Sequence, residues 1–375
     1  MLESTATRGA WAGGGRSLRS CAAVVVLGFA LAACSGNLGA PIIACEPGAG
    51  VEPFCGFSNP EDLVYFAPAH SVFVSQFGSL DGSIPGSLAS FDPQAPRVNL
   101  LYPGAGLDHP EPGWGSPLCP GPPGPAFAPH GLDLIQRADG RHALLVVNHG
   151  GRESVEYFEA DADERGLPRL RWRGCVVMPE PSYLNDLVAL SDGGFWATHM
   201  YARDAEMSSV LKAMFGTNSG WVIEWRPASG FMEVPGTRAP MPNGIARCSD
   251  ERYIYLNAYL GGQVRRIDSR TGAVVAAVDV PYPDNVTWAE DGRLLVASHR
   301  GSLFDLVSCQ DVRSGTCALP FSILALDPDD LTPTVLLERE DVPTGAVSVA
   351  LQVGADIWLG TFAGDRVARM QWPKD

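Results

Sequence analysis

A short turn that carries acidic or amide residues and leads into an apolar strand recurs six times along the chain. The turns are Glu61-Asp62-Leu63, Gly131-Leu132-Asp133, Asn185-Asp186-Leu187, Asn243-Gly244-Ile245, Asp284-Asn285-Val286 and Gly345-Ala346-Val347. They recur at intervals of about 40 to 70 residues, and a second short strand usually follows each one after a polar break. A repeat of this length built from short strands is typical of a β-propeller. We therefore expect an all-β fold.

Polar residues at equivalent points of successive blades converge on the axis of a propeller. The candidates are Glu61, Asp62, Asn185, Asp186, Asn243, Asp284 and Asn285. A single Asn or Asp in a turn is usually structural, but here they recur at one phase of the repeat. Carboxylates crowded in one tunnel would repel each other and would be costly to bury without a cation. Calcium takes six to eight oxygen ligands of these kinds, so we expect one or two Ca²⁺ ions.

Two histidines form a second candidate constellation. His130 precedes one strand, and His149 ends the strand expected to pair with it through the turn at Ala138-Asp139-Gly140. Both imidazoles should then lie at the same edge of the disc, where they could act as a general-base pair. The alternative is that each is an ordinary polar residue at a strand end.

The charge and the motifs disfavour other classes of function. The net charge of −15 argues against nucleic-acid binding, which needs a basic face. The sequence has no G-x-S-x-G, H-E-x-x-H or G-x-x-x-x-G-K-[ST] motif, and no G-x-G-x-x-G that opens a helix. These absences disfavour a serine hydrolase, a zinc peptidase and a nucleotide-dependent enzyme.

The N-terminus has the pattern of an export signal. Three arginines precede an apolar run over residues 21–33 that is too short to span a bilayer, and the run ends in Leu-Ala-Ala-Cys34. This ending resembles a bacterial lipobox, so we expect residues 1–33 to be removed and Cys34 to carry a lipid anchor to the membrane. An ordinary cleaved signal peptide is the alternative. Ser35 favours the outer membrane, at its periplasmic face or at the cell surface. Residues 34–58 are expected to be a tether, and residues 59–375 the propeller.

Seven cysteines follow Cys34, which suits an exported protein with disulfides. Close spacing in loops predicts the pairs Cys45–Cys55 and Cys309–Cys317, and Cys119–Cys175 is a further candidate pair. Cys248 is then the free thiol, more easily explained by burial than by reactivity.

Two segments interrupt the strand pattern. Residues 104–129 are rich in Pro and Gly and are expected to form a long loop over one face of the disc. Residues 203–215 predict a helix with Met207, Val210, Leu211 and Met214 near one face. This helix could pack on the rim, or it could contact a membrane or a substrate.

The run His130-Gly131-Leu132, the strand that ends at Asn148-His149 and the segment Glu153–Phe158 closely resemble the calcium-dependent paraoxonase/arylesterase lactonases. The likeness includes the turns at Glu61, Asn185, Asn243 and Asp284, together with Ser298-His299 and Gly360-Thr361-Phe362. It covers nearly all of the expected mature chain. The wider gluconolactonase-like propellers share the fold but lack the histidine pair. The resemblance implies a six-bladed β-propeller with two Ca²⁺ ions.

The resemblance also implies roles for individual residues. It implies a catalytic calcium held by Glu61, Asn185, Asn243, Asp284 and Asn285. A deeper structural calcium would be held by Asp62, Asp186 and the backbone carbonyl of Leu132. His130 would be the base and His149 its partner, with Asp284 as the rival nucleophile or base. We expect the substrate pocket to include Met241, His199, His299 and Phe362.

The sequence departs from this family in two ways. No cysteine follows Cys317, so the disulfide that commonly ties the N-terminal strand to the last blade is missing. Met241-Pro242 precedes Asn243 where relatives often have an aromatic residue, so specificity cannot be carried over. The expected activity is calcium-dependent hydrolysis of a lactone or ester. The alternatives are a gluconolactonase-type enzyme without the histidine pair and a non-catalytic ligand-binding propeller.

Overall fold

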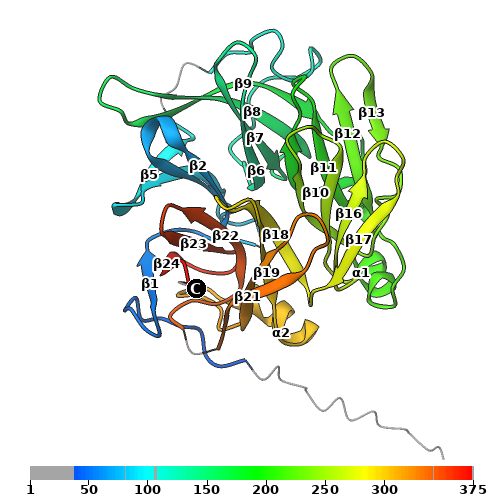
Figure 1. Cartoon of the computed structure of the whole chain (residues 1–375). Helices are drawn as coiled ribbons and strands as arrows, with labels where there is room; N and C mark the ends of the chain where they lie inside the picture. Colours follow the sequence, from blue (N-terminus) through cyan, green and yellow to red (C-terminus); the bar gives the residue numbers. More distant parts are fainter. Residues whose placement is uncertain (1–37, 81, 105–107, 341, 374–375) are drawn as a thin grey trace, which may run out of the picture. The chain divides into compact units, whose positions relative to one another are not determined.

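The computed structural model describes residues 38–373 except 81, 105–107 and 341, and these residues form a six-bladed β-propeller (Figure 1). The fold predicted from the repeat and from the family resemblance is therefore confirmed. Each blade is a four-stranded antiparallel sheet. The expected signal segment and Cys34 lie outside the described residues. No described helix has the length and apolar character that crossing a membrane requires.

The strands follow the chain blade by blade, with the first strand of each set innermost. Blade 1 contains β2 (Pro60–Phe66), β3 (Ser71–Gln76), β4 (Ser87–Asp92) and β5 (Ala95–Tyr102). Blade 2 contains β6 (Pro129–Gln136), β7 (His142–Asn148), β8 (Ser154–Ala162) and β9 (Pro168–Val177). Blade 3 contains β10 (Ser182–Ala189), β11 (Phe195–Ala202), β12 (Trp221–Arg226) and β13 (Gly230–Glu233).

The second half repeats the pattern. Blade 4 contains β14 (Pro242–Arg247), β15 (Tyr253–Ala258), β16 (Gln263–Asp268) and β17 (Val274–Asp279). Blade 5 contains β18 (Pro283–Trp288), β19 (Leu294–His299), β20 (Phe321–Leu326) and β21 (Pro333–Arg339). Blade 6 contains β22 (Val347–Val353), β23 (Asp356–Thr361), β24 (Arg366–Gln371) and β1 (Val51–Cys55). The innermost strands β2, β6, β10, β14, β18 and β22 contact one another in sequence around the axis.

Every innermost strand has an irregular register with the second strand of its blade, near its first residues. The residues left out of the ladder are Glu61, His130, Gly131, Asn185, Asp186, Asn243, Gly244, Asp284, Asn285 and Ser348. Such bulges bend a strand and re-aim its side chains. The same backbone irregularity therefore releases most of the predicted site residues from the sheets.

In the sixth blade the released residue is Ser348, whereas the sequence places the turn at Gly345-Ala346-Val347. A buried serine resembles any other strand residue, so the sequence pattern predicts the turn a few positions too early. The Ser348 hydroxyl donates a 2.6 Å hydrogen bond to the Glu61 carbonyl oxygen, which links blade 6 to blade 1.

The N-terminal strand closes the ring. β1 pairs with β24, so residues 51–55 belong to blade 6 although the sequence assigns them to a tether (Figure 1). The strand is short and surrounded by Gly and Pro, which obscured its pattern. Arg366, which is fully buried, adds to this closure because its guanidinium donates to the carbonyl oxygens of Ile42 (2.8 Å) and Ala44 (2.6 Å). Backbone pairing and one arginine thus fasten this end of the chain to the last blade.

Short helices lie at three connections between the described strands. η2 (Arg203–Ala205) and α1 (Glu206–Met214) follow β11, as the sequence predicts. α2 (Leu303–Ser308) and η3 (Cys309–Asp311) follow β19 and were not predicted. A further turn, η1 (Ala67–Ala69), joins β2 to β3. Ser302 caps α2 through a capping box with Asp305, a signal that the strand pattern masked.

The described part of the Pro-rich segment first runs along the outer edge of blade 2, where the Glu111 N–H donates to the Arg173 carbonyl and the Ser116 N–H to the Cys175 carbonyl. Trp114 is buried there beneath the guanidinium of Arg137. An outer strand has unpaired backbone groups, and this segment satisfies some of those of β9. Its later residues lie at the end of β7, where the Ala128 carbonyl accepts from the His149 N–H.

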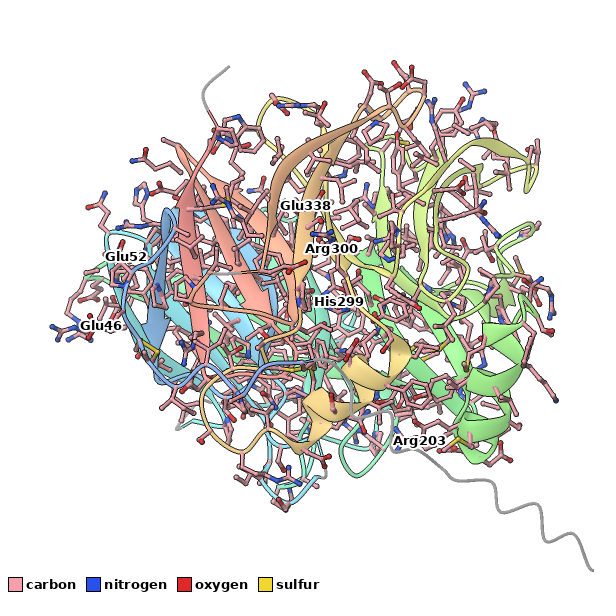
Figure 2. All side chains as sticks on the ribbon, turned by 90° about the horizontal axis from the view of Figure 1, so that it is seen from below. Glu46, Glu52, Arg203, His299, Arg300 and Glu338 are labelled. Atoms are coloured by element: carbon pink, nitrogen blue, oxygen red, sulfur yellow. A yellow bond between two sulfur atoms is a disulfide. The ribbon has the colours of Figure 1, made fainter. Side chains whose placement is uncertain are left out.

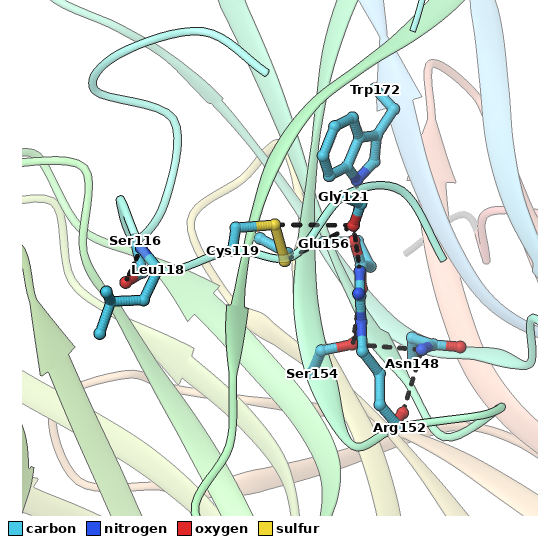
Figure 3. Close-up of a disulfide and its surroundings, with 10 residues drawn as sticks. Ser116, Leu118, Cys119, Gly121, Asn148, Arg152, Ser154, Glu156 and Trp172 are labelled. Carbon is cyan, nitrogen blue, oxygen red and sulfur yellow. Dashed lines mark hydrogen bonds and ion pairs between the residues drawn. A yellow bond between two sulfur atoms is a disulfide. The ribbon is translucent and has the colours of Figure 1, made fainter. Parts of the chain in front are cut away.

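Three disulfides connect the cysteine pairs expected from the sequence, Cys45–Cys55, Cys119–Cys175 and Cys309–Cys317. They indicate an extracytoplasmic protein. Among the described residues, Cys248 is the free cysteine; it is half-buried, and its thiol donates to Asp250. Figure 3 shows the Cys119–Cys175 bridge beside Gly121, whose carbonyl accepts from Arg152 at 2.7 Å.

Candidate active site

Five predicted ligands lie in the bulges around the axis, and we call Glu61, Asn185, Asn243, Asp284 and Asn285 the oxygen ring. All five side chains are buried, with relative exposures between 2% and 5%. Asn285 Nδ2 donates to Glu61 Oε1 at 2.9 Å, and Asn243 hydrogen bonds to the Asp284 carboxylate. Blades 1, 4 and 5 are thus connected directly through these side chains.

Four oxygens of this ring have no hydrogen-bond donor. They are Glu61 Oε2, Asn185 Oδ1, Asn243 Oδ1 and Asn285 Oδ1. Leaving a buried acceptor unsatisfied costs about 1–3 kcal/mol, so four in one place need an explanation. Hard cations such as Ca²⁺ bind this donor set of carboxylate and amide oxygens. Among the described residues no three His, Cys, Asp or Glu side chains form a metal cluster, because this ring is largely amide.

Burial raises the pKa of Asp284 well above its usual range, and the nearby charge of Glu61 raises it further. Its Oδ2 lies 3.5 Å from His299 Nε2. His299 is itself buried, which lowers its pKa to about 4, and its Nδ1 lies 2.8 Å from the Tyr259 hydroxyl. Near neutral pH this histidine is therefore uncharged and does not compensate the carboxylates. The negative charge of the ring has to be balanced by a bound cation or by protons.

Two glycines allow the innermost strands to approach closely at these bulges. A Cβ on Gly131 would lie 2.5 Å from Asp186 Cα, and one on Gly244 would lie 2.3 Å from the Asp284 carbonyl oxygen. Real Cβ atoms do not come so close to backbone. Both positions therefore exclude any side chain, and their backbone forms part of the tunnel wall.

Asp62 and Asp186, which we call the aspartate pair, are each the next residue after a ring member. Asp62 accepts from the N–H of Leu63 and from that of Leu132 in the next blade, both at 2.8 Å. Asp186 accepts from Leu187 at 2.7 Å and from Ile245 of the following blade at 2.9 Å. Each carboxylate therefore joins two blades.

Leu132, whose carbonyl was the expected third ligand of this pair, donates its N–H to Asp62. Burial raises the pKa of both aspartates well above the usual range, and neighbouring carboxylates add to the effect. The pair borders a cavity of about 690 Å³ that is also lined by Leu132, Ile245 and Val286.

The two histidines lie together as predicted. His130 Nδ1 is 2.8 Å from His149 Nε2, and His130 Nε2 is 3.5 Å from Glu61 Oε1. Phe77 packs against both imidazole rings. The ring of Tyr183 stacks on His149 with a centroid separation of 4.3 Å. Burial lowers the pKa of His149, so this residue is neutral near pH 7. His130 connects the buried histidine to the oxygen ring.

Glu153 completes this chain of contacts, and the sequence did not identify it as a site residue. Its carboxylate lies 3.0 Å from His149 Nδ1 and accepts from the Leu184 N–H at 2.6 Å and from Arg203. Burial would raise the pKa of Glu153, but His149, Leu184 and Arg203 together outweigh it, and the pKa is lowered. The available signal was its position four residues after His149, across a turn.

The structure brings two of the four expected pocket residues into contact. His299 and Phe362 contact each other, with ring centroids 5.2 Å apart. His199 is buried against Trp221, and burial lowers its pKa to about 4. Met241 is half-buried and holds a left-handed backbone conformation, with φ of 52°. Non-glycine residues held in this region often lie at functional sites.

The arylesterase family model matches residues 117–361, more than half of the chain. This range begins after Glu61 and Asp62, so the structure alone brings those two residues to the matched part. No curated protein matches the sequence.

Several solved structures share the fold. A gluconolactonase from Xanthomonas campestris is 16% identical with a TM-score of 0.50, over 90% of this chain and 97% of that chain. A luciferin-regenerating enzyme is 14% identical with a TM-score of 0.52, over 88% and 95%. Regucalcin from Agrobacterium tumefaciens, described as a calcium-binding protein, is 12% identical with a TM-score of 0.46, over 89% and 94%. At these identities the first two likenesses establish the propeller fold alone.

Proposed function

The chain belongs to the arylesterase family, and from this premise we propose that it is a calcium-dependent hydrolase of lactones or related esters. The observation that carries the proposal is the set of four buried ring oxygens without donors, beside a hydrogen-bonded histidine pair. A cation there would satisfy the oxygens and balance the charge of Glu61 and Asp284.

When bound, the calcium ion would supply a Lewis acid that polarises the substrate carbonyl and stabilises the negative charge that develops on its oxygen. Glu61, Asn185, Asn243, Asp284 and Asn285 would hold it. His130 would accept a proton from the attacking water at Nε2, the nitrogen that faces the ring. His149 would stabilise the resulting imidazolium through the contact at His130 Nδ1.

Asp284 is the alternative base. Its raised pKa would make it a better proton acceptor than an ordinary carboxylate if no cation were bound, but a ligated carboxylate loses that property. We therefore assign proton transfer to His130. Replacing His130 with Gln should remove most of the activity, whereas an enzyme of the gluconolactonase type without the histidine pair would be nearly indifferent to the change.

We further propose that a second, structural calcium lies at the aspartate pair. Backbone N–H groups donate hydrogen bonds to these carboxylates, but these neutral donors do not neutralise two buried charges. The adjoining cavity gives an ion access. Calorimetric titration of chelated protein should then give two calcium ions per chain, and a single ion would reject this second site while leaving the first.

The substrate is proposed to be a small lactone or ester that binds among Met241, His199, His299 and Phe362. We also propose that the protein is lipid-anchored through Cys34 and located at the outer membrane. Replacing Cys34 with Ala should release the protein from the membrane fraction, and unchanged fractionation would argue against the anchor.

The deciding experiment measures hydrolysis of a panel of lipophilic lactones, sugar lactones and aryl esters, before and after thorough chelation. Chelation should abolish the activity and added Ca²⁺ should restore it. Activity that survives chelation would contradict the mechanism. Full calcium binding without hydrolysis of any member would instead favour a binding protein.

A further inference from the structure

Glu153 has no role in the proposed function, although its contacts with neighbouring residues are well defined. It is a buried carboxylate in contact with the histidine partner, yet it lies away from the oxygen ring on the far side of both imidazoles. Each of its oxygens has a separate donor besides His149. Oε1 accepts from the Leu184 N–H, and Oε2 accepts from Arg203 at the start of the insertion that carries α1 (Figure 2).

An ionised carboxylate can only accept hydrogen bonds, and this determines the protons of both rings. His149 Nδ1, at 3.0 Å from Glu153, must carry a hydrogen, so a neutral His149 leaves Nε2 as a bare acceptor. That acceptor lies 2.8 Å from His130 Nδ1, which must therefore be the N–H donor. His130 Nε2 is then the nitrogen without a hydrogen, and it is the one that faces Glu61.

The opposite pair of tautomers for His149 and His130 would prevent His130 from acting as the base. If His149 carried its hydrogen on Nε2, it would donate to His130 Nδ1, and a neutral His130 would then carry its hydrogen on Nε2. A ring protonated there cannot accept a proton from water. Two coupled imidazoles by themselves do not choose between these arrangements, so the carboxylates at the two ends decide. Glu153 lies 3.0 Å from His149 Nδ1, within hydrogen-bond distance, whereas Glu61 Oε1 lies 3.5 Å from His130 Nε2 and accepts from Asn285.

We infer that Glu153 is a positioning residue that holds His149 and His130 in the tautomers in which Nε2 of His130 is free to accept a proton. This inference rests on the proposed function for its catalytic consequence, but the tautomers themselves do not depend on a substrate. Arg203 keeps the carboxylate in place from the solvent side, with 43% of its side chain exposed. The stacked rings of Tyr183 and Tyr201 fix the plane of His149.

The test is the protonation of each ring nitrogen in protein labelled with ¹⁵N-histidine, read from long-range ¹H–¹⁵N spectra at neutral pH. The chain has seven histidines, so the signals can be assigned with His130→Gln and His149→Gln. Calcium-loaded wild type should show Nδ1–H for both His130 and His149. In Glu153→Gln, His130 should move toward Nε2–H, because an amide nitrogen can donate to His149.

Activity gives the second measurement. Glu153→Gln should lower kcat by roughly 10²-fold with little change in KM. The proton-accepting nitrogen of His130 would be blocked by a hydrogen, but the substrate-binding residues would be unchanged. Glu153→Asp keeps the charge and should restore the wild-type tautomers and part of kcat. It also keeps the test informative if the Gln variant does not fold.

Glu156→Gln is the matched control. Glu156 lies on β8, which begins directly after Glu153, is fully buried and accepts from Arg152, Ser154 and Trp172, but these partners place it beside the disulfide (Figure 3). Its replacement should leave the tautomers and kcat unchanged even if the protein becomes less stable.

The inference is overturned if wild-type His130 is protonated at Nε2, or if Glu153→Gln leaves both tautomers as they are. Failure of the proposed function would give a different result. The tautomers of His130 and His149 would be those described above, but neither the wild type nor any variant would hydrolyse a substrate.

Discussion

The two members of the aspartate pair directly follow two members of the oxygen ring along the chain, yet the oxygens of the two sets have different hydrogen-bond partners. In the ring, four acceptors have no donor. In the pair, each carboxylate oxygen accepts a backbone N–H, one from its own strand and one from the next blade. A shift of one residue along the strand separates oxygens that have no donor in the protein from oxygens that each accept a backbone N–H and join two blades.

The backbone shape at the start of an innermost strand therefore does not determine the role of the side chains there. Asp133 is a third aspartate that joins two blades. It accepts from the Leu134 N–H of its own strand and from the Ala189 N–H of the next blade. The joint between blades is a general device of this propeller, whereas unpaired oxygens mark one place in it. Replacements should therefore affect activity in the ring and stability in the pair.

The largest effect is expected for Asp284→Ala. Removing a ring carboxylate should reduce hydrolysis on the order of 10³-fold, because both the cation and the charge it stabilises are affected. Steady-state kinetics at saturating Ca²⁺ would measure the loss. Asp329→Ala, at a side chain that is 87% exposed, is the control and should retain wild-type activity. Equal losses in the two variants would remove the distinction on which the ring is based.

For the aspartate pair, Asp186→Asn should mainly reduce stability. An Asn side chain can accept from Leu187 or Ile245 but presents an NH₂ group to the other N–H, so one joint is lost. We expect the free energy of unfolding to fall by about 1–3 kcal/mol. Urea denaturation in the presence of Ca²⁺ would measure it. Unchanged stability combined with a large loss of kcat would place Asp186 with the ring instead.

Asn185→Asp tests the difference between the oxygen ring and the aspartate pair by adding a charge to the ring. A third carboxylate in the ring should strengthen calcium binding by roughly tenfold, because ligand charge raises affinity for Ca²⁺. Without calcium the same variant should be less stable than wild type, because the added charge is buried beside Glu61 and Asp284. Calorimetric titration and thermal melts measure the two effects. Weaker calcium binding would show that Asn185 is not a ligand.

The smallest effect concerns pH. The pKa of Glu153 is lowered, in contrast to the raised pKa values of Asp62, Asp186 and Asp284. A carboxyl with a lowered folded-state pKa contributes stability that is complete above its unfolded value near 4.5 and is lost as the pH falls through the folded value. The stability difference between wild type and Glu153→Gln should therefore be constant at higher pH and shrink below about 4.5. A difference that grows on acidification would contradict this sign.

Much of the fold was readable from the sequence because the bulge residues repeat with the blades. Glu61, Asn185, Asn243 and Asp284 could be placed at the start of the innermost strands from their type and phase alone. Ser348 could not, since a serine in a strand has no distinctive chemistry. Glu153 was missed for another reason: its role depends on Leu184 and Arg203, which lie 31 and 50 residues away in sequence. β1 was missed because its pairing partner lies at the other end of the chain.

The pairing of β1 with β24 has a consequence for how the protein is made. Val51 and Met370 are partners in the register, so the first strand of the described residues remains without its neighbour until the last of them has been made. Sheets that depend on such distant partners fold slowly and expose unpaired edges in the meantime. Five blades can assemble as they emerge, but the ring cannot close until both ends of the chain meet. Shortening either end should therefore weaken the whole ring, including the ligand positions contributed by blades far from the cut.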